Sequence, residues 1–520
     1  MIRSTFMGFE AAKSSIFANQ KSLDIVGNNL ANSETSGYTR QRVDRASAYV
    51  QAHATRIASS TVGVAGQGVN TLGVSQVRDA FLDKCFREEY SLSSYHGQTS
   101  ELQNDILNIF PEAADITDSS GILGGLEKIY QGLNKYIQAP TLDSEANIVR
   151  SAFTNMTQVL QQMDKRLTEV TIRQTEDLSS TLLRTNDILS QIAHINKKIA
   201  ADCTVLANPD SQYFVPNELA DQRNLLLDEL AGYGNINVKQ NSNGTINVEM
   251  FGHLVVDRGE SDAITMSTKN NGYVSISWRS SGKDVIDSES STGAIKAYAS
   301  VLNGRGANVQ SNDETSVQGI PYYRDAINLF AAELVKVANN TIPVADKDGK
   351  PSVDADGNII YKTLLAAKQA DGTTNSKAPI TAANIAISDE WIQGGSGYFI
   401  YSRDENVENY AQQLSAKLNE QDAVFDSYGE SFTGTFRDFT VDLVGRIGSD
   451  VGFNEGRRAA AATVANDFIQ QRDSVSGVQQ DEETADMLKY QKSYAAAARV
   501  MTTMDDLLDT LINKVGRVGL

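Results

Sequence analysis

The sequence is poor in the residues from which metal centres and disulfide frameworks are built. It holds 2 cysteines and 4 histidines among 520 residues. Cys85 and Cys203 lie far apart without a C-x-x-C spacing, which favours two free buried thiols over a redox or metal pair. The histidines form no H-E-x-x-H or H-x-x-x-H pair. They are His53, His96, His194 and His253. We therefore expect no metal site.

Positive charge and long apolar runs are also scarce. The 46 Lys and Arg are outnumbered by 65 Asp and Glu, a formal net charge of -19. Phosphate backbones and anionic lipids are bound through clustered cations, so the sequence predicts no nucleic-acid or membrane-surface role. No uncharged apolar run reaches the roughly 18 residues that span a bilayer. The N-terminal segment also lacks the apolar core of a secretory signal. We expect a soluble protein without membrane insertion or a cleaved signal peptide.

Motifs for catalysis and cofactor binding are incomplete wherever they begin. Lys283 follows a glycine, as in a phosphate-binding loop, but Asp284 stands where Ser or Thr is required. Ser396 lacks the glycine spacing of a hydrolase nucleophile. A calcium loop centred on Gly357 would place Thr363 where a bidentate Glu is needed, which favours simple Asp-Gly turns. We therefore predict no catalytic residue, no cofactor and no enzymatic activity.

What the sequence does contain is an apolar stripe near its C-terminus. The residues are spaced alternately by three and four, the pattern of a coiled-coil seam. They are Met487, Tyr490, Tyr494, Ala497, Met501, Met504, Leu508, Leu511 and Val515. Acidic residues at 481–483 precede the stripe and Lys514 lies near its end, and both placements favour the helix dipole. The pattern predicts a long amphipathic helix.

The N-terminal segment carries a second stripe of similar length. Its members are Ile2, Phe6, Phe9, Ile16, Leu23, Val26 and Leu30. Lys13 and Gln20 interrupt the apolar face. Two such faces cannot stay in water without inviting association. They pair within one chain, or they also pack against copies and neighbours in an assembly. The tyrosines and methionines of the C-terminal seam slightly favour the assembly.

The middle of the chain changes from helical to β texture. Residues 88–202 read as a long helical zone, in which eleven apolar positions between 156 and 199 keep helical spacing without an intervening proline. They are Met156, Leu160, Met163, Leu167, Val170, Leu178, Leu182, Ile188, Ile192, Ile195 and Ile199. Short alternating runs then occupy about 233–300, with the hairpin signal Asn243-Gly244 between two of them. A helix returns near 322–340, and helices resume from about 405.

These patterns predict a mainly α protein with a β-rich middle domain. We expect a terminal α-helical coiled coil formed by both chain ends, a helical bundle domain and an outer β domain. The first comprises residues 1–45 and 480–520, and the second 46–204 and 405–479. The third comprises 205–404, mostly β with the returning helix.

Two motifs resemble a known family. The stretch from Asn28 to Gln41 reads NNLANSETSGYTRQ, and that from Ser474 to Glu483 reads SVSGVQQDEE. Both are similar to signatures of flagellar rod, hook and hook-associated proteins, and the second favours the hook-associated members. The motif residues are Asn29, Asn32, Thr35, Gly37, Tyr38, Gly477, Asp481, Glu482 and Glu483.

The resemblance implies a structural axial protein of the bacterial flagellum, joining hook to filament. It would be secreted by the flagellar type III system, lie outside the cell and support motility. Its partners would be copies of itself in a ring or helical layer, the hook protein, the second hook-filament junction protein, and an export chaperone at the C-terminal helix. Two alternatives stay open. One is another axial protein, namely hook protein, second junction protein or flagellin. The other, less favoured, is an axial scaffold carrying an inserted hydrolase at 205–400.

Overall fold

The computed structural model describes most of the chain. The described residues are 6–48, 68–114, 120–140, 142–206, 216–269, 272–286, 291–309, 314–346, 350–401, 410–421, 423–427 and 430–514. The chain divides into two compact units. Unit 1 comprises residues 1–91, 184–263 and 461–520, and unit 2 comprises residues 92–183 and 264–460.

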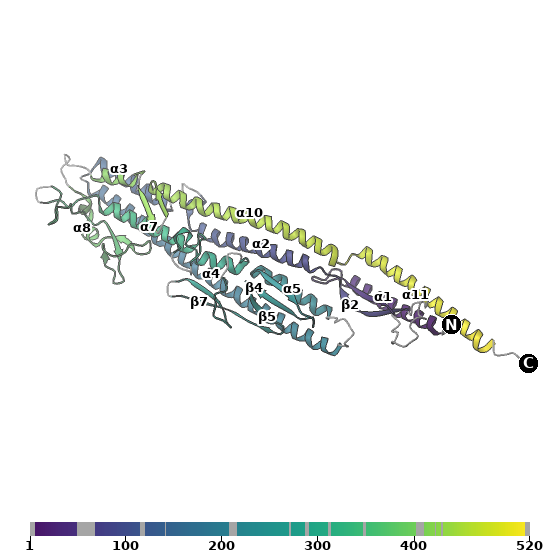
Figure 1. The fold of residues 1–520 in the computed structure, drawn as a ribbon. Helices are drawn as coiled ribbons and strands as arrows, with labels where there is room; N and C mark the ends of the chain where they lie inside the picture. The colour runs from purple at the N-terminus through teal and green to yellow at the C-terminus, as the bar shows by residue number, and fades with distance from the viewer. Residues whose placement is uncertain are drawn as a thin grey trace, which may run out of the picture. The chain divides into compact units, whose positions relative to one another are not determined.

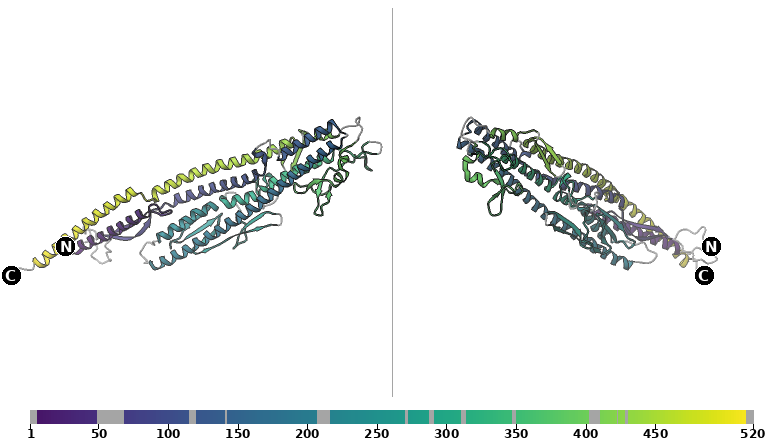
Figure 2. Two further views of the ribbon diagram at one scale, coloured as in Figure 1. Left: turned by 180° about the vertical axis from the view of Figure 1, so that it is seen from behind. Right: turned by 60° about the vertical axis from the view of Figure 1, so that its left-hand side comes forward.

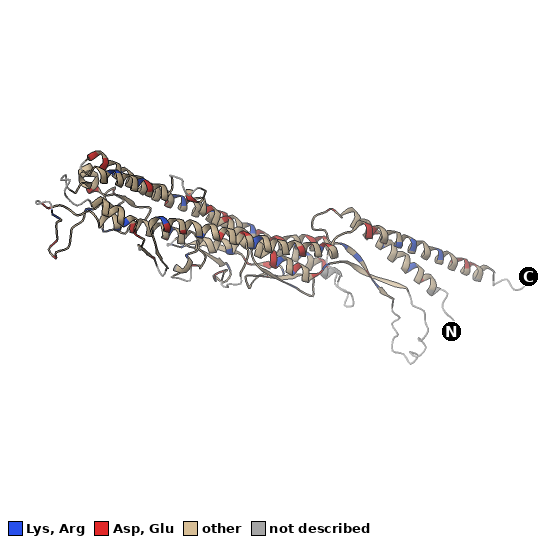
Figure 3. Ribbon diagram, turned by 90° about the horizontal axis from the view of Figure 1, so that it is seen from above, with Lys and Arg blue, Asp and Glu red and all other residues tan. Residues whose placement is uncertain are grey.

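The described chain is mainly helical (Figure 1), which confirms the predicted fold class at its coarsest level. The long helices are α1 (Phe6–Ala31), α2 (Ala80–Leu107), α3 (Ile122–Gln138), α4 (Asp143–Leu206), α10 (Phe436–Ser476) and α11 (Gln480–Asp509). Helices α2, α4 and α10 contribute residues to both units. Lys and Arg are interspersed with Asp and Glu along the helices (Figure 3). Such mixing keeps helix surfaces soluble while their apolar faces pack inward.

Helix α4 forms where the sequence predicts helical spacing, and it is 64 residues long. Ten of the eleven apolar positions from Met156 to Ile199 are buried, and Val170 is half-buried. Asp143 and Glu145 lie in the first turn, where negative charge favours the helix dipole. No proline interrupts the run, so the backbone hydrogen bonds continue without a break. The buried stripe shows why this helix supplies core residues to each unit.

Unit 1 combines helices with two small antiparallel sheets. The first sheet pairs β1 (Gln41–Ser47) with β2 (Val69–Gln76). The second has the order β3-β4-β5-β6, with β3 (Ile236–Gln240), β4 (Ile246–Met250), β5 (His253–Asp257) and β6 (Glu260–Ser261), and it follows helix α5 (Asn217–Tyr233). The predicted Asn243-Gly244 hairpin is confirmed between β3 and β4, and Gly244 has a φ of 78°. That positive φ explains why glycine suits the turn.

A buried asparagine ties α4 to this hairpin. Asn196 is fully buried, and its Nδ2 donates to the carbonyl oxygens of Ile246 (2.9 Å) and Arg258 (2.5 Å). Its Oδ1 accepts from Arg223 of α5 at 3.0 Å, and Arg223 also donates to the carbonyl oxygen of Gly244 at 3.0 Å. Helix α4, the hairpin and α5 therefore share one buried polar centre.

Unit 2 is built around helices with three small antiparallel sheets. Its further helices are α6 (Ala294–Leu302), α7 (Ile320–Asn339), α8 (Asp389–Phe399) and α9 (Tyr410–Leu418). Its strands are β7 (Ile264–Thr268), β8 (Val274–Trp278), β9 (Leu365–Lys368), β10 (Thr374–Asn375), β11 (Ile385–Ile387), β12 (Val424–Ser427) and β13 (Glu430–Thr433), in sheets β7-β8, β10-β9-β11 and β12-β13. Edge-to-face aromatic contacts support the core. The ring centroids of Phe330 and Phe425 lie 5.2 and 5.0 Å, respectively, from the ring centroid of Phe436.

The middle segment differs from the expected texture. Within 205–404, for which the sequence predicts mostly β structure, helices α5, α6, α7 and α8 cover more residues than the short strands β3 to β11. The physical reason is that short apolar runs do not distinguish buried strand from buried helix. The two units also follow boundaries other than those of the predicted three domains, and the three-part division stays a prediction.

A buried lysine lies in unit 2. Lys362 is 9% exposed, and its Nζ donates to the carbonyl oxygens of Tyr398 (2.8 Å) and Ile400 (3.0 Å). The ammonium loses its hydration there, so burial lowers the pKa of Lys362 to about 8. The folded chain therefore releases this proton at a lower pH than the unfolded chain.

We expect the free energy of unfolding to rise between about pH 8 and pH 10. Over this range the unfolded chain still binds the Lys362 proton and the folded chain does not, which adds roughly 2–3 kcal/mol. Urea unfolding at several pH values measures the rise. Lys362→Met is the control, since it cannot titrate and should give a flatter profile. Identical profiles for both proteins would contradict the assignment.

Candidate site where the chain ends meet

Helices α1 and α11 pack side by side in unit 1, and Figures 1 and 2 show the pairing from several directions. Val26 of α1 and Ala497 of α11 are buried between surrounding side chains. The other described seam side chains of α1 are half-buried, namely Phe9, Ile16, Leu23 and Leu30. So are Met487, Tyr490, Met501, Met504 and Leu508 of α11, while Tyr494 is exposed. Ile2 and Val515, and the side chains of Phe6 and Leu511, lie outside the described residues.

A glycine allows the two helices to approach closely at one end of the pair. A Cβ atom at Gly8 would lie 2.6 Å from Cε of Met504. The methionine side chain therefore fills the space above the glycine. The spacing of apolar residues in the sequence does not predict this contact between Met504 and Gly8.

Strand β1 adds an arginine that bridges both helices. Arg45 donates from Nη2 to the carbonyl oxygen of Ala18 (2.9 Å) and to Ser22 Oγ, and from Nη1 to Asn19 Oδ1 (3.2 Å). Its guanidinium also lies 5.0 Å from the ring centroid of Tyr490 in α11. A cation over an aromatic face is attracted to it, so Arg45 links α1, β1 and α11.

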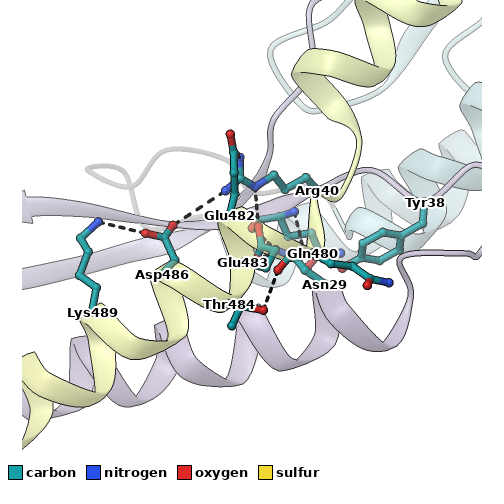
Figure 4. A network of polar contacts seen from close by, with 10 residues as sticks. Asn29, Tyr38, Arg40, Gln480, Glu482, Glu483, Thr484, Asp486 and Lys489 are labelled. Atoms are coloured by element: carbon teal, nitrogen blue, oxygen red, sulfur yellow. Dashed lines mark hydrogen bonds and ion pairs between the residues drawn. The ribbon is translucent and has the colours of Figure 1, made fainter.

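A polar network marks the point where α11 begins (Figure 4). Asn29, near the end of α1, donates from Nδ2 to the carbonyl oxygen of Gln41 (2.9 Å) and to Glu483 Oε2 (3.1 Å). Its Oδ1 accepts from the backbone N–H of Gln41 (3.1 Å) and from the Tyr38 hydroxyl (2.8 Å). One amide side chain thus joins α1, the loop that follows it, strand β1 and α11.

Arg40 provides the positive charge of this network. Its Nε lies 2.6 Å from Glu483 Oε1 and its Nη1 lies 3.1 Å from Glu482 Oε2, with Asp486 further away at 3.8 Å. The side chain of Glu483 is 2% exposed, whereas that of Glu482 is 56% exposed. The pair with Glu483 is therefore the one that water screens least.

The break between α10 and α11 is held by Arg40, the residue that precedes β1. The backbone N–H of Arg40 donates to the carbonyl oxygen of Ser476 at 2.8 Å, and that of Gly477 donates to Asp473 at 2.8 Å. A Cβ at Gly477 would collide with the Asp473 carbonyl oxygen, so glycine suits this helix end. The two backbone hydrogen bonds and the need for glycine at residue 477 therefore both explain why the helix breaks at this point.

The loop from Asn32 to Tyr38 turns the chain from α1 into β1. The backbone N–H of Tyr38 donates to the carbonyl oxygen of Thr35 at 3.1 Å, and Gly37 has a φ of 79°. A Cβ at Gly37 would lie 2.5 Å from the side chain of Leu225 in α5. Glycine is required here by the backbone conformation and by the approach of α5.

A buried aspartate of α5 continues the polar contacts on the far side of this loop. Asp221 accepts from the Thr39 hydroxyl (2.6 Å) and from Gln76 Nε2 (2.8 Å). Burial raises the pKa of Asp221, and hydrogen bonds from Thr39 oppose that shift. Burial, with Asp221 as the next contribution, raises the pKa of Tyr38 to about 12. Tyr38 therefore keeps its proton and acts as a hydrogen-bond donor at neutral pH.

The arrangement suits a structural junction between segments of the chain. Asn29, Arg40 and Glu483 are bonded to one another or to neighbours in the same network. In the described parts of the chain, no three His, Cys, Asp or Glu residues are grouped to hold a metal ion. Of the histidines, His96 lies 2.8 Å from Asn454 Oδ1 and His253 lies 3.0 Å from Asp262, while His53 lies outside the described residues. No helix in the described ranges is long and apolar enough to cross a bilayer.

Comparison with known protein families places these features in context. Residues 114–349 match the flagellar hook-associated protein FlgK helical domain. Residues 10–39 match the flagella basal body rod protein family, and residues 469–514 match the flagellar basal body rod FlgEFG protein C-terminal family. Flagellar hook-associated protein 1 of Bacillus subtilis is 28% identical over 552 residues, covering 99% of each chain. The chain is therefore similar over nearly its whole length to the FlgK family of flagellar hook-associated proteins.

Further relatives agree with this similarity. Flagellar hook-associated protein 1 of Salmonella typhimurium is 24% identical, covering 96% of this chain and 98% of that protein. The solved structure of the flagellar hook junction protein FlgK from Burkholderia pseudomallei shares the fold, with a TM-score of 0.52 and 13% identity, over 76% of this chain and 100% of that chain. FlgK-family proteins are structural components of the flagellum, so the chain is a flagellar motility protein.

The structure brings most of the FlgK-family motif residues together. Asn29, Tyr38, Glu482 and Glu483 lie in the network of Figure 4. Asn32, Thr35 and Gly37 form the turn, and Gly477 lies at the helix break. Asp481 is exposed in the first turn of α11. Whether these residues and the seams serve assembly stays a prediction.

Three contributors are absent from the predicted site residues. Arg40 lies inside the motif stretch from Asn28 to Gln41, and Asp221 lies inside a further stretch, Asn217 to Leu225, whose sequence also resembles the family. Arg45 gave no signal, because its partner Tyr490 lies far away in the sequence. Such contacts become visible only when the chain is folded.

Glu483→Gln should destabilise unit 1, whereas Glu482→Gln should have little effect. The buried substitution removes the charge that faces Arg40 and leaves the guanidinium poorly compensated, at a cost of about 1–3 kcal/mol. Glu482→Gln removes an exposed, solvent-screened contact with Arg40 that is worth about 0–1 kcal/mol. Chemical denaturation of both variants measures the difference. Equal destabilisation by the two variants would contradict the assigned role of Glu483.

Gly37→Ala should destabilise the protein by roughly 1–3 kcal/mol, because alanine resists the positive φ and meets Leu225. Gly27→Ala is the matched control. Gly27 lies inside helix α1, and apart from its two chain neighbours and the backbone of the same helix no atom lies within 4 Å of the position that a Cβ atom would take there. Alanine at this position should therefore be neutral or stabilise by up to about 1 kcal/mol. Thermal unfolding of both variants shows whether each substitution raises or lowers the stability. Stabilisation by Gly37→Ala would show that the turn is not constrained as described.

Proposed function

We propose that this chain is the structural axial protein that joins hook to filament, and that it assembles through the pair of terminal helices. The proposal rests on the observation that helices α1 and α11 pack together and still expose apolar side chains. Leu488, Val500 and Leu507 of α11 are 54%, 47% and 58% exposed, and Phe17 of α1 is 58% exposed. Large apolar groups gathered on one helix pair favour burial against another protein surface.

The geometry of the helix pair supports different roles for two sides of α11. The seam residues, including Met501 and Leu508, are half-buried on a helix that packs against α1, and we propose that they hold the two chain ends together. Val500 and Leu507 are seven residues apart, so they lie on the same side of α11 and flank that seam. We propose that this flanking side packs against neighbouring copies in a terminal coiled-coil layer.

The remaining partners follow from the family and from the charge of the chain. We propose contacts with the hook protein and with the second hook-filament junction protein, and shielding of α11 by an export chaperone before assembly. The resulting location is the extracellular hook-filament junction, reached through the flagellar type III system. The chain's excess of acidic residues, with a net charge of -19, favours partners that do not depend on nucleic acid or lipid.

Cells lacking the gene should carry bare hooks and release flagellin into the medium, which electron microscopy and an immunoassay of the medium measure. The wild-type gene should restore filaments, and Leu507→Asp should not, because a charge on the flanking side opposes packing. Thr502→Asp is the control, since Thr502 is exposed and lies roughly 140° around α11 from Leu507. It should restore filaments.

Two outcomes would contradict the proposal. Normal filaments in the deletion strain would remove the junction role. Normal filaments with Leu507→Asp, in a variant whose thermal unfolding matches wild type, would remove the flanking side of α11 as the assembly surface. The two results are independent, so role and surface are tested separately.

A further inference from the structure

Unit 1 contains a cavity that the terminal helix pair does not use. Its volume is about 650 Å³, within the range of small-molecule sites. It is lined by the first turns of α2, by α5 and by the sheet that begins with β3. Arg87, Leu227 and Ile246 are buried members of the lining, whereas Phe81 and Lys84 are exposed. The cavity therefore combines a buried apolar and cationic wall with an edge that reaches the surface.

Positive charge exceeds negative charge in the ion-paired cluster beside this wall. Arg78 lies 2.6 Å from Asp83, and Arg87 Nε lies 2.7 Å from Asp228. Arg472 Nη1 lies 2.7 Å from Asp228 and 3.6 Å from Asp83. Three guanidinium groups thus share two carboxylates. A further carboxylate of the lining, Asp44, is paired with Arg42 at 3.1 Å.

One buried donor of the cluster remains unused. Arg87 is 7% exposed, and its Nη2 has no hydrogen-bond partner although its Nε is bonded to Asp228. A buried guanidinium nitrogen without an acceptor costs free energy, so an acceptor at this position would be stabilised. Lys84 precedes Arg87 by three residues and therefore lies on the same side of α2. A second cation stands at the exposed edge of the same cavity.

We propose that this cavity binds a carboxylate carried on a short aliphatic chain. The carboxylate accepts from Arg87 Nη2 and is attracted by Lys84, while its methylene groups pack against Leu227 and Ile246. A single open guanidinium donor suits a carboxylate, and charge-assisted hydrogen bonds of this type are short and strong. Two sources carry this chemistry, namely a free aliphatic dicarboxylate and a Glu side chain of a second copy of this chain. The site is independent of the junction role proposed above.

Calorimetric titration of the full chain with glutarate, in a low-salt buffer free of carboxylates, tests the free ligand. We expect saturable one-site binding that Arg87→Met weakens at least tenfold and Lys84→Gln weakens severalfold. Arg184→Met is the matched control, because Arg184 is exposed, lies outside the lining and pairs with Glu229 on the surface of unit 1. It should bind glutarate as the wild type does.

Sedimentation velocity of the same proteins tests the second source. If glutarate does not bind, self-association should be weaker for Arg87→Met and Lys84→Gln than for wild type and Arg184→Met. The exposed Lys84→Gln keeps the test decisive if Arg87→Met unfolds. The proposal is overturned if wild type binds no glutarate and self-association is unchanged in Lys84→Gln. It is also overturned if glutarate binds Lys84→Gln and a folded Arg87→Met as tightly as wild type. Because flagellar assembly in cells is not the readout, a failed junction role leaves this result interpretable.

Discussion

The buried carboxylate of Glu483 is the group on which the arrangement of the chain ends depends. Its two oxygens accept from Arg40 and from Asn29, and its side chain is 2% exposed. A carboxylate held so far from water is stable only where charge and hydrogen bonds are both supplied. Asn29 in turn fixes the backbone of Gln41, and Arg40 fixes that of Ser476. The start of α11, the end of α1 and the start of β1 are therefore set by one connected network.

The terminal pair contrasts with the rest of its unit in how much it buries. On α4 and α5 the apolar positions Ile192, Ile199, Leu227 and Leu230 are almost inaccessible to water. Along α11 only Glu483 and Ala497 are buried. A helix with so little buried surface gains modest stability from tertiary packing. Polar anchors such as Arg45 and Glu483 then matter more, and apolar side chains such as Leu507 stay exposed. The proposed assembly through this helix pair rests on that exposed apolar surface.

Buried polar groups have different roles in different parts of unit 1. Asn196, Arg223 and Asp221 are surrounded by partners and join helices to hairpin and loop. Their role is to specify one packing arrangement, because any other would leave buried donors or acceptors unpaired. The cluster around Arg87 is different, since a donor remains without an acceptor. The first group of contacts defines the fold, and the open donor of Arg87 is the observation on which the proposed carboxylate site rests.

The sequence by itself determined the mainly helical class, the α4 stripe, the Asn243-Gly244 hairpin and the family motifs, because each is encoded by residues close together in the chain. The amphipathic period of the last helix was also local information. Short apolar runs in 205–404 were ambiguous between strand and helix, and tertiary packing decided for α5, α6 and α8. Only the folded chain placed Arg40 beside Glu483, Arg45 over Tyr490 and Thr39 against Asp221. The reason is physical: a charge pair or hydrogen bond across hundreds of residues has no periodicity to read, and it exists only once the intervening chain has folded.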